Sequence, residues 1–177
     1  GTDWGDINIG DIKKAIYKAL DLGVNFFDTA GVYGLGLSEE RLSKILGNHR
    51  HNAVIATKGG LSWKYSSTDR AIVVNNSSPL AIRKDVESSL SRLRLDCLPI
   101  FYVHRPDDKI PIFETFMELE KIRNEGKIKF IGCSNFSVDQ IEDACSVSKV
   151  DYIQLPINLL NETLDTNLEN ICTRKEI

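Results

Sequence analysis

Three ionisable side chains end apolar segments of this sequence: the carboxylate of Asp28, the ammonium of Lys58 and the imidazole of His104. A phenol, Tyr33, follows five residues after Asp28. Each of these residue types has an ordinary structural use, as a turn cap, a solvated charge, a hydrogen-bonded histidine or a half-packed ring. Their common position, directly after segments of strand character, favours one shared site over four independent structural uses.

Together these groups can protonate the oxygen of a carbonyl that is being reduced. A partly buried ammonium needs a carboxylate partner, so we expect Lys58 to lie beside Asp28. A cation close to a phenol stabilises the phenolate, which enables Tyr33 to give up a proton near neutral pH. His104 can donate a hydrogen bond to the carbonyl oxygen. Because no side chain supplies hydride, this chemistry implies a nicotinamide cofactor.

The elements that position these groups alternate between strands and helices. Short runs rich in β-branched and aromatic residues predict strands at Asn25–Ala30, Ala53–Lys58, Leu98–His104, Lys129–Ser134 and Tyr152–Asn158. Amphipathic stretches between them predict helices at Asp11–Leu22, Ser38–Leu46, Pro79–Leu95, Pro111–Glu125, Val138–Ser146 and Asp165–Lys175. Apolar strands separated by helices indicate a parallel sheet covered by helices, whose carboxyl strand ends open on one face. That face also receives Ser134, Asn135 and Gln154.

Two architectures fit this alternation, an open doubly wound sheet and a closed (β/α)8 barrel. The sequence contains neither G-x-G-x-x-G nor G-x-x-x-x-G-K-[ST], the glycine-rich turns typical of open nucleotide-binding sheets. The longest stretch without a clear element is Gly59–Ser77, and a loop of that length in a compact domain is usually functional or disordered. Its aromatic residues Trp63 and Tyr65 line an apolar substrate wall or pack against the barrel rim, and the sequence leaves both open.

Helix boundaries have their own signals. Ser78 ahead of Pro79 predicts a capping hydroxyl before a proline at the first helical position. Ser137 with Gln140 predicts a capping box. The helices therefore begin where the sequence supplies partners for their unpaired N–H groups.

Composition excludes several classes of protein. The chain has 177 residues, with 22 Lys+Arg against 25 Asp+Glu and a formal charge of −3, so no basic surface for nucleic acid is expected. No membrane span or signal peptide is recognisable, and we expect a cytoplasmic protein. No cysteine pair has metal-ligand spacing, and Cys97 and Cys133, in or beside apolar runs, are expected to be buried thiols.

Motifs along nearly the whole chain resemble those of the aldo-keto reductases. They are Gly23-Val-Asn-Phe-Phe-Asp28-Thr-Ala-Gly-Val-Tyr33-Gly, Ser38-Glu-Glu with Leu46-Gly47, Ile55-Ala-Thr-Lys58, Tyr102-Val-His104-Arg-Pro-Asp, Gly126-Lys-Ile-Lys-Phe-Ile-Gly-Cys-Ser134-Asn135-Phe, and Ile153-Gln154 with Asn158-Leu-Leu-Asn. The resemblance implies a (β/α)8 barrel that binds NADPH or NADH and reduces the carbonyl of a small aldehyde or ketone. It favours the barrel over the open sheet.

The resemblance also implies a role for each matched residue. Tyr33 corresponds to the general acid, Lys58 to the group that tunes it, Asp28 to the orienter of Lys58, and His104 to the substrate-orienting group. The residues that correspond to those holding the nicotinamide carboxamide are Ser134, Asn135 and Gln154. No metal is implied.

The sequence departs from the family pattern in two ways. Ile157 stands where an aromatic residue commonly follows the glutamine, and Pro156 precedes it, which alters the local pocket shape. A complete (β/α)8 barrel needs about 250 residues, so only about six of its eight β/α units fit into this chain. We therefore treat residues 1–177 as one partial barrel domain. Gly1-Thr2 resembles only the tail of a first strand, and the match stops before a seventh, so two strand edges are expected to be bare.

Three functions are compatible with these residues. The first is an NAD(P)H-dependent carbonyl reductase. The second is a regulatory or binding subunit on the same fold, since the β subunits of voltage-gated potassium channels resemble this family and retain its tetrad. The third is an inactive, truncated pseudoenzyme. The identity of the substrate, the choice between NADPH and NADH and the oligomeric state are left open by the sequence.

Overall fold

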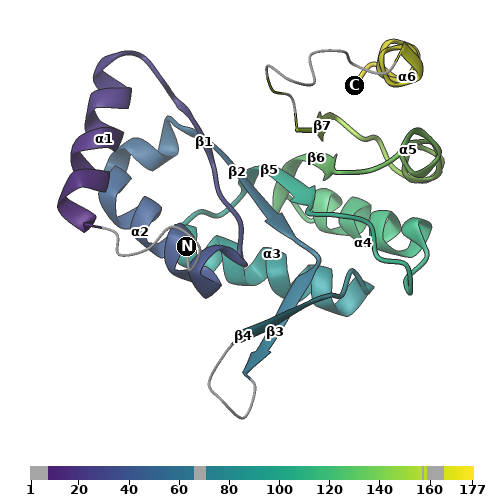
Figure 1. Cartoon of the computed structure of the whole chain (residues 1–177), viewed down its shortest axis with the longest axis horizontal. Coiled ribbons are helices and arrows are strands. Elements are labelled where there is room, and N and C mark those ends of the chain that lie inside the picture. Colours follow the sequence, from purple (N-terminus) through teal and green to yellow (C-terminus); the bar gives the residue numbers. More distant parts are fainter. Residues whose placement is uncertain (1–7, 66–70, 157, 159–165) are drawn as a thin grey trace.

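The computed structural model describes residues 8–65, 71–156, 158 and 166–177, and its centre is a parallel sheet (Figure 1). The strands are β1 (Phe26–Asp28), β2 (Val54–Gly59), β5 (Leu98–Val103), β6 (Ile128–Ser134) and β7 (Tyr152–Gln154). Their spatial order is β1-β2-β5-β6-β7, and every neighbouring pair is parallel. This order follows the chain without reversal, as in a barrel and unlike a doubly wound sheet. The predicted α/β class with a partial (β/α)8-type sheet is confirmed.

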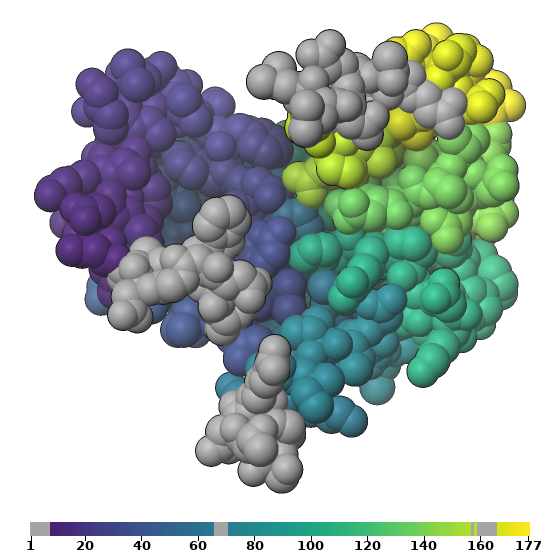
Figure 2. All heavy atoms as spheres, viewed as in Figure 1, coloured from purple at the N-terminus to yellow at the C-terminus, as the bar shows by residue number. Residues whose placement is uncertain are grey.

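Six α-helices and two 3₁₀ turns accompany these strands among the described residues. They are α1 (Ile9–Asp21), η1 (Tyr33–Gly36), α2 (Leu37–Leu46), η2 (Gly47–His51), α3 (Pro79–Leu93), α4 (Ile112–Asn124), α5 (Val138–Cys145) and α6 (Thr166–Lys175). Residues 1–7, and with them the predicted tail of a first strand at Gly1-Thr2, lie outside the described residues. In the space-filling view the purple N-terminal helices and the yellow C-terminal helix lie on opposite sides of the molecule (Figure 2).

The predicted end of the last strand and the predicted Ser78 cap were wrong, whereas the predicted capping box was confirmed. The last strand ends at Gln154 instead of Asn158, since Pro156 has no N–H to pair with a neighbouring strand. Ser78 precedes α3 but does not cap it, because its hydroxyl donates to Asn76 Oδ1 at 2.8 Å. The capping box that Ser137 begins is present at the start of α5.

The two faces of the sheet differ by the parity of the residue number. Side chains at odd positions, such as Phe101 and Ile131, join the large core between the sheet and its helices, and α3 contacts β2 and β5 there. Side chains at even positions form the inner face, except at the start of β5 and β6, where Leu98 and Ile128 join the large core. The buried apolar side chains of the inner face are Ala56, Ile100 and Tyr102, with Val54 and Phe130 packed against them. Because strand side chains alternate, each strand contributes to both faces.

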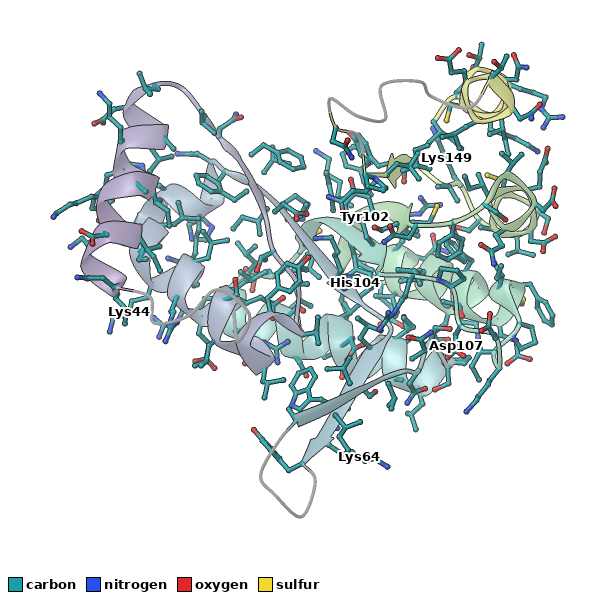
Figure 3. The ribbon with its side chains drawn as sticks, viewed as in Figure 1. Lys44, Lys64, Tyr102, His104, Asp107 and Lys149 are labelled. Carbon is teal, nitrogen blue, oxygen red and sulfur yellow. The ribbon has the colours of Figure 1, made fainter. Side chains whose placement is uncertain are left out.

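The stretch predicted as a long loop contains a β-hairpin. β3 (Leu61–Tyr65) pairs antiparallel with β4 (Ala71–Asn75), and residues 66–70 lie outside the described residues. The alternation around Trp63 and the β-branched residues of β4 were the missed signal. The hairpin extends away from the main sheet, with Lys64 far from His104 (Figures 1 and 3).

Trp63 and Tyr65 therefore belong to a strand. Trp63 lines a pocket of about 490 Å³ between the hairpin and α3. Tyr65 is exposed.

Cys97 differs from its prediction, since it is exposed, whereas Cys133 is buried as expected. Cys97 lies in the bend just before β5, whereas Leu98, the first residue of that strand, is buried. Burial raises the pKa of the Cys133 thiol to about 12, which keeps it protonated.

Among the described residues, no helix has the length and apolar character needed to cross a membrane.

Candidate active site

The candidate site lies at the carboxyl ends of the parallel strands, on the inner face. Asp28 and Lys58 stand at or next to the last position of β1 and β2, and His104 directly follows β5. Ser134 and Gln154 end β6 and β7 and are register partners. All five have even numbers and therefore share one face of the sheet. The convergence predicted from the sequence is confirmed, and Figure 3 shows His104 near the middle of this view.

The buried Lys58 makes an ion pair with Asp28, as predicted, and the Asp28 side chain is 37% exposed. The Lys58 Nζ donates to Asp28 Oδ2 at 2.6 Å and to Oδ1 at 2.8 Å. It also donates to the Thr29 carbonyl oxygen at 3.0 Å. The Lys58 side chain is only 2% exposed, so these acceptors replace the water that the ammonium loses. Thr29 was missed because a backbone carbonyl leaves no signal in the sequence.

Tyr33 lies next to both Lys58 and His104. The Lys58 Nζ is 5.1 Å from the centroid of the Tyr33 ring, within the range of a cation–π contact. The Tyr33 and His104 rings meet edge-on, with centroids 5.7 Å apart. Tyr33 remains exposed, so the phenol is accessible to a small molecule at this rim. Four residues from three strands and one loop thus form a single cluster.

His104 is held as a neutral imidazole. Its backbone N–H donates to the Gly59 carbonyl at 2.9 Å, which fixes it beside the end of β2. Burial lowers the pKa of His104 to about 4, aided by the charges of Lys58 and Arg105 and partly opposed by Asp28. Its Nδ1 is buried without a hydrogen-bond partner in the part of the chain described. A neutral imidazole has one N–H to donate to a ligand.

A chain of amide and hydroxyl groups completes the rim. Asn135 Nδ2 donates to the His104 carbonyl at 3.1 Å and to Ser134 Oγ at 3.0 Å. Ser134 Oγ donates to Gln154 Oε1 at 3.4 Å, and Gln154 Nε2 donates to Asp28 Oδ1 at 3.2 Å. The last bond joins β7 to β1, the two edges of the sheet. Because hydroxyl and amide groups can donate and accept, this set fits a carboxamide.

Tyr102 forms the floor of the inner face below the cluster. A Cβ at Gly132 would lie 2.4 Å from the Tyr102 ring, so β6 needs glycine where this ring crosses it. Burial raises the pKa of Tyr102 to about 12, with a further contribution from the Asp28 carboxylate. Tyr102 is therefore a packed, neutral phenol.

The sequence and the fold both match known proteins. A model of the Aldo/keto reductase family matches residues 1–177. Aldo-keto reductase YhdN of Bacillus subtilis is 35% identical over 170 residues, which are 95% of this chain and 50% of the relative. An NADH-specific methylglyoxal reductase of Escherichia coli is 32% identical, over 97% of this chain and 56% of its own length.

A solved structure supports the same assignment. The glycerol dehydrogenase AKR11B4 of Gluconobacter oxydans superposes with a TM-score of 0.90 at 38% identity, over 98% of this chain and 53% of that chain. This chain thus spans about half the length of the proteins that it matches. The family model, the sequence relatives and the shared fold agree: the chain belongs to the aldo/keto reductase family.

Proposed function

We propose that the protein is an NAD(P)H-dependent carbonyl reductase with Tyr33 as its general acid. The observation that carries this proposal is the contact of the Tyr33 ring with both the buried Lys58 ammonium, at 5.1 Å, and the His104 ring, at 5.7 Å. A phenol between a fixed cation and a neutral imidazole is suited to transferring a proton to an oxygen that gains negative charge.

Each residue has one task in this mechanism. Asp28 holds Lys58 charged and in place through two hydrogen bonds. The Lys58 cation stabilises the negative charge that develops on Tyr33 as its hydroxyl gives up a proton to the carbonyl oxygen. His104 donates its N–H to the same oxygen and aligns the substrate. A nicotinamide cofactor, when bound, supplies the hydride.

The polar rim is suited to orienting this cofactor. Ser134, Asn135 and Gln154 would hold the carboxamide of the nicotinamide, because they offer donors and acceptors within one connected set. They would thereby fix which face of the ring meets the substrate. NADPH and NADH carry the same carboxamide, so both are tested.

Small polar aldehydes are the proposed substrate class. The names of two relatives, a methylglyoxal reductase and a glycerol dehydrogenase, refer to three-carbon compounds. The Tyr33 phenol is 40% exposed and therefore accessible to a small substrate. A cytoplasmic location fits such substrates.

The decisive assay follows NADPH or NADH oxidation by the complete natural protein with methylglyoxal and glyceraldehyde. Tyr33→Phe is compared with Tyr17→Phe, a matched control because Tyr17 is also exposed and lies 5.6 Å from a lysine ammonium. We expect Tyr33→Phe to lose activity by about 10²–10⁴-fold and Tyr17→Phe to lose none. Equal activity of the two variants would show that Tyr33 is not the general acid. If the wild type oxidises neither NADPH nor NADH, a binding subunit is favoured instead.

A further inference from the structure

The loop that carries Tyr33 has an unfavourable backbone. Gly34, Leu35 and Gly36, which follow Tyr33 directly, have φ values of 58°, 56° and 98°. Glycine adopts such left-handed angles freely, but Leu35 does so only at a cost. The Tyr33 ring is itself 40% exposed, so its contacts with Lys58 and His104 hold it only in part. Something outside the loop must fix where the phenol lies.

Arg92, on α3, lies against both ends of this loop. A Cβ at Gly31 would come within 3.2 Å of Arg92 Nη2, and one at Gly36 within 2.9 Å of Arg92 Cδ. These two glycines enclose Tyr33 in the sequence, and the Gly31 N–H donates to the Lys58 carbonyl at 3.2 Å. The arginine side chain thus forms a support beneath the loop.

Glu39 holds this arginine and the Lys58 strand at once. Its carboxylate is 0% exposed. One oxygen accepts from Arg92 Nε at 2.5 Å, and the other accepts from Thr57 Oγ1 at 2.6 Å. Thr57 is the residue before Lys58 on β2. A single carboxylate therefore connects α2, which follows the Tyr33 loop, to α3 and to the strand that carries the lysine.

Another buried glutamate–arginine pair provides a contrast. Glu118 on α4 accepts from Arg83 Nε at 2.6 Å, and its side chain is 10% exposed. That pair joins α3 to α4 on the helical side and reaches no residue of the candidate site. Buried ion pairs seldom add net stability, but they can select one arrangement among similar ones.

We propose that Glu39, Thr57 and Arg92 form a positioning cluster that sets the place of the Tyr33 phenol against the Lys58 ammonium. The three residues lie behind the site, so none is a catalytic residue. The inference rests on the proposed function, because it assigns the cluster to the proton-donating pair of that reaction. Small displacements of reacting groups lower turnover steeply without weakening substrate binding to the same extent.

The sharpest test uses Thr57 in the complete natural protein. Thr57→Val removes one hydrogen bond to Glu39 and keeps the side-chain shape, whereas Thr57→Ser keeps the hydroxyl. We expect Thr57→Val to lower kcat by about tenfold with KM within about twofold, and Thr57→Ser to restore most of kcat. Glu39→Gln is expected to lower kcat further, while Glu118→Gln lowers the melting temperature and leaves kcat unchanged.

Crystal structures of the wild type and Thr57→Val give a readout that does not depend on activity. We expect the distance of 5.1 Å between Lys58 Nζ and the Tyr33 ring centroid to increase in Thr57→Val. An unchanged distance with wild-type kcat would overturn the inference, as would an equal loss of kcat in Glu118→Gln. If Glu39→Gln does not fold, the Thr57 pair decides. A wild type that reduces no carbonyl refutes the proposed function, whereas the crystallographic distance still tests the cluster.

Discussion

The side chains on the two faces of the same sheet differ strongly in their exposure to solvent. On the outer face, Phe101 and Ile131 are fully buried beneath helices that also contribute Phe116. On the inner face, Phe26 and Tyr152, on the two edge strands, are 46% and 41% exposed. Apolar burial is the main source of folding free energy. The outer face therefore contributes most of the apolar burial in this chain, whereas the rim of the inner face carries the candidate chemistry.

This difference indicates how the fold separates stability from function. The polar cluster lies at the rim of the inner face, where buried charge is tolerated because Asp28 and the Thr29 carbonyl pair with Lys58. α3 and α4 pack against the strands on the opposite face. Substitutions on the two faces should therefore affect different measurements, activity for one and stability for the other.

The largest effect is expected from Lys58→Met in the complete natural protein. It removes the cation beside Tyr33 but leaves Ser134, Asn135 and Gln154 intact, so we expect turnover to fall by at least about 100-fold with cofactor affinity largely kept. Nucleotide oxidation and fluorescence titration with NADPH and NADH measure the two quantities. Near-normal turnover would refute the tetrad assignment. His104→Ala should be milder, since it removes orientation and not the proton donor.

A matched pair of phenylalanines tests the stability half of the comparison. Phe116→Ala, on the buried outer side, should cost about 3–5 kcal/mol of unfolding free energy, because it leaves a cavity. Phe26→Ala, on the open inner face, should cost less than about 1 kcal/mol in the 177-residue chain, because the ring is already half in water. Urea denaturation of both variants measures the difference. Similar losses would mean that the inner face is covered in solution, and light scattering would then report self-association.

Most of the fold and the position of the site could be predicted from the sequence. Apolar runs ending at Asp28, Lys58 and His104 predicted three strands and their common end, because a parallel sheet places carboxyl ends together. The hairpin of β3 and β4 was missed because its side chains are largely exposed, so no core pattern marks it. The alternation of residue types in β3 and β4 was too weak a signal to replace the expectation of a long loop.

Contacts across distant elements could not be predicted from the sequence. Glu39 meets Arg92, 53 positions away, through the packing of α2 against α3. The hydrogen bond from Gln154 to Asp28 spans 126 positions and depends on the curvature of the sheet. Such pairs have no local signal, since periodicity reports which face a side chain takes and not which partner it meets.

The inner face should also determine a pH dependence through His104. Its pKa in the folded protein is about 4, below the ordinary 6.5, so the unfolded chain binds more protons between these values. The His104 contribution to stability is therefore expected to be constant above pH 6.5 and to fall by up to about 3 kcal/mol as the pH drops toward 4. Denaturation curves of the wild type and His104→Asn measure this slope. If His104→Asn keeps the full dependence of the unfolding free energy on pH, another group is responsible for it.

The smallest effect, of opposite sign, is expected from Asp85 on α3. Burial raises the pKa of this carboxyl to about 6, and the nearby charge of Glu39 adds to the rise. A hydrogen bond from the Gly60 N–H at 2.8 Å and the charges of Arg92 and Lys84 oppose it. The folded chain then binds more protons than the unfolded one between about pH 4 and 6, so the Asp85 contribution to stability falls as the pH rises through this range and is constant above it.

Asp85→Asn keeps an acceptor for the Gly60 N–H and removes the charge. It should be more stable than the wild type at pH 7 by about 1–2 kcal/mol, since Asp85 retains some contact with water, and the gain should vanish near pH 4. Asp143→Asn, at an exposed position of α5, controls for the loss of a carboxylate as such. Thermal unfolding at a series of pH values compares the three proteins. A destabilised Asp85→Asn at pH 7 would show that the charged carboxylate is favoured beside Arg92, and would place Asp85 in the positioning cluster of Glu39, Thr57 and Arg92 instead of outside it.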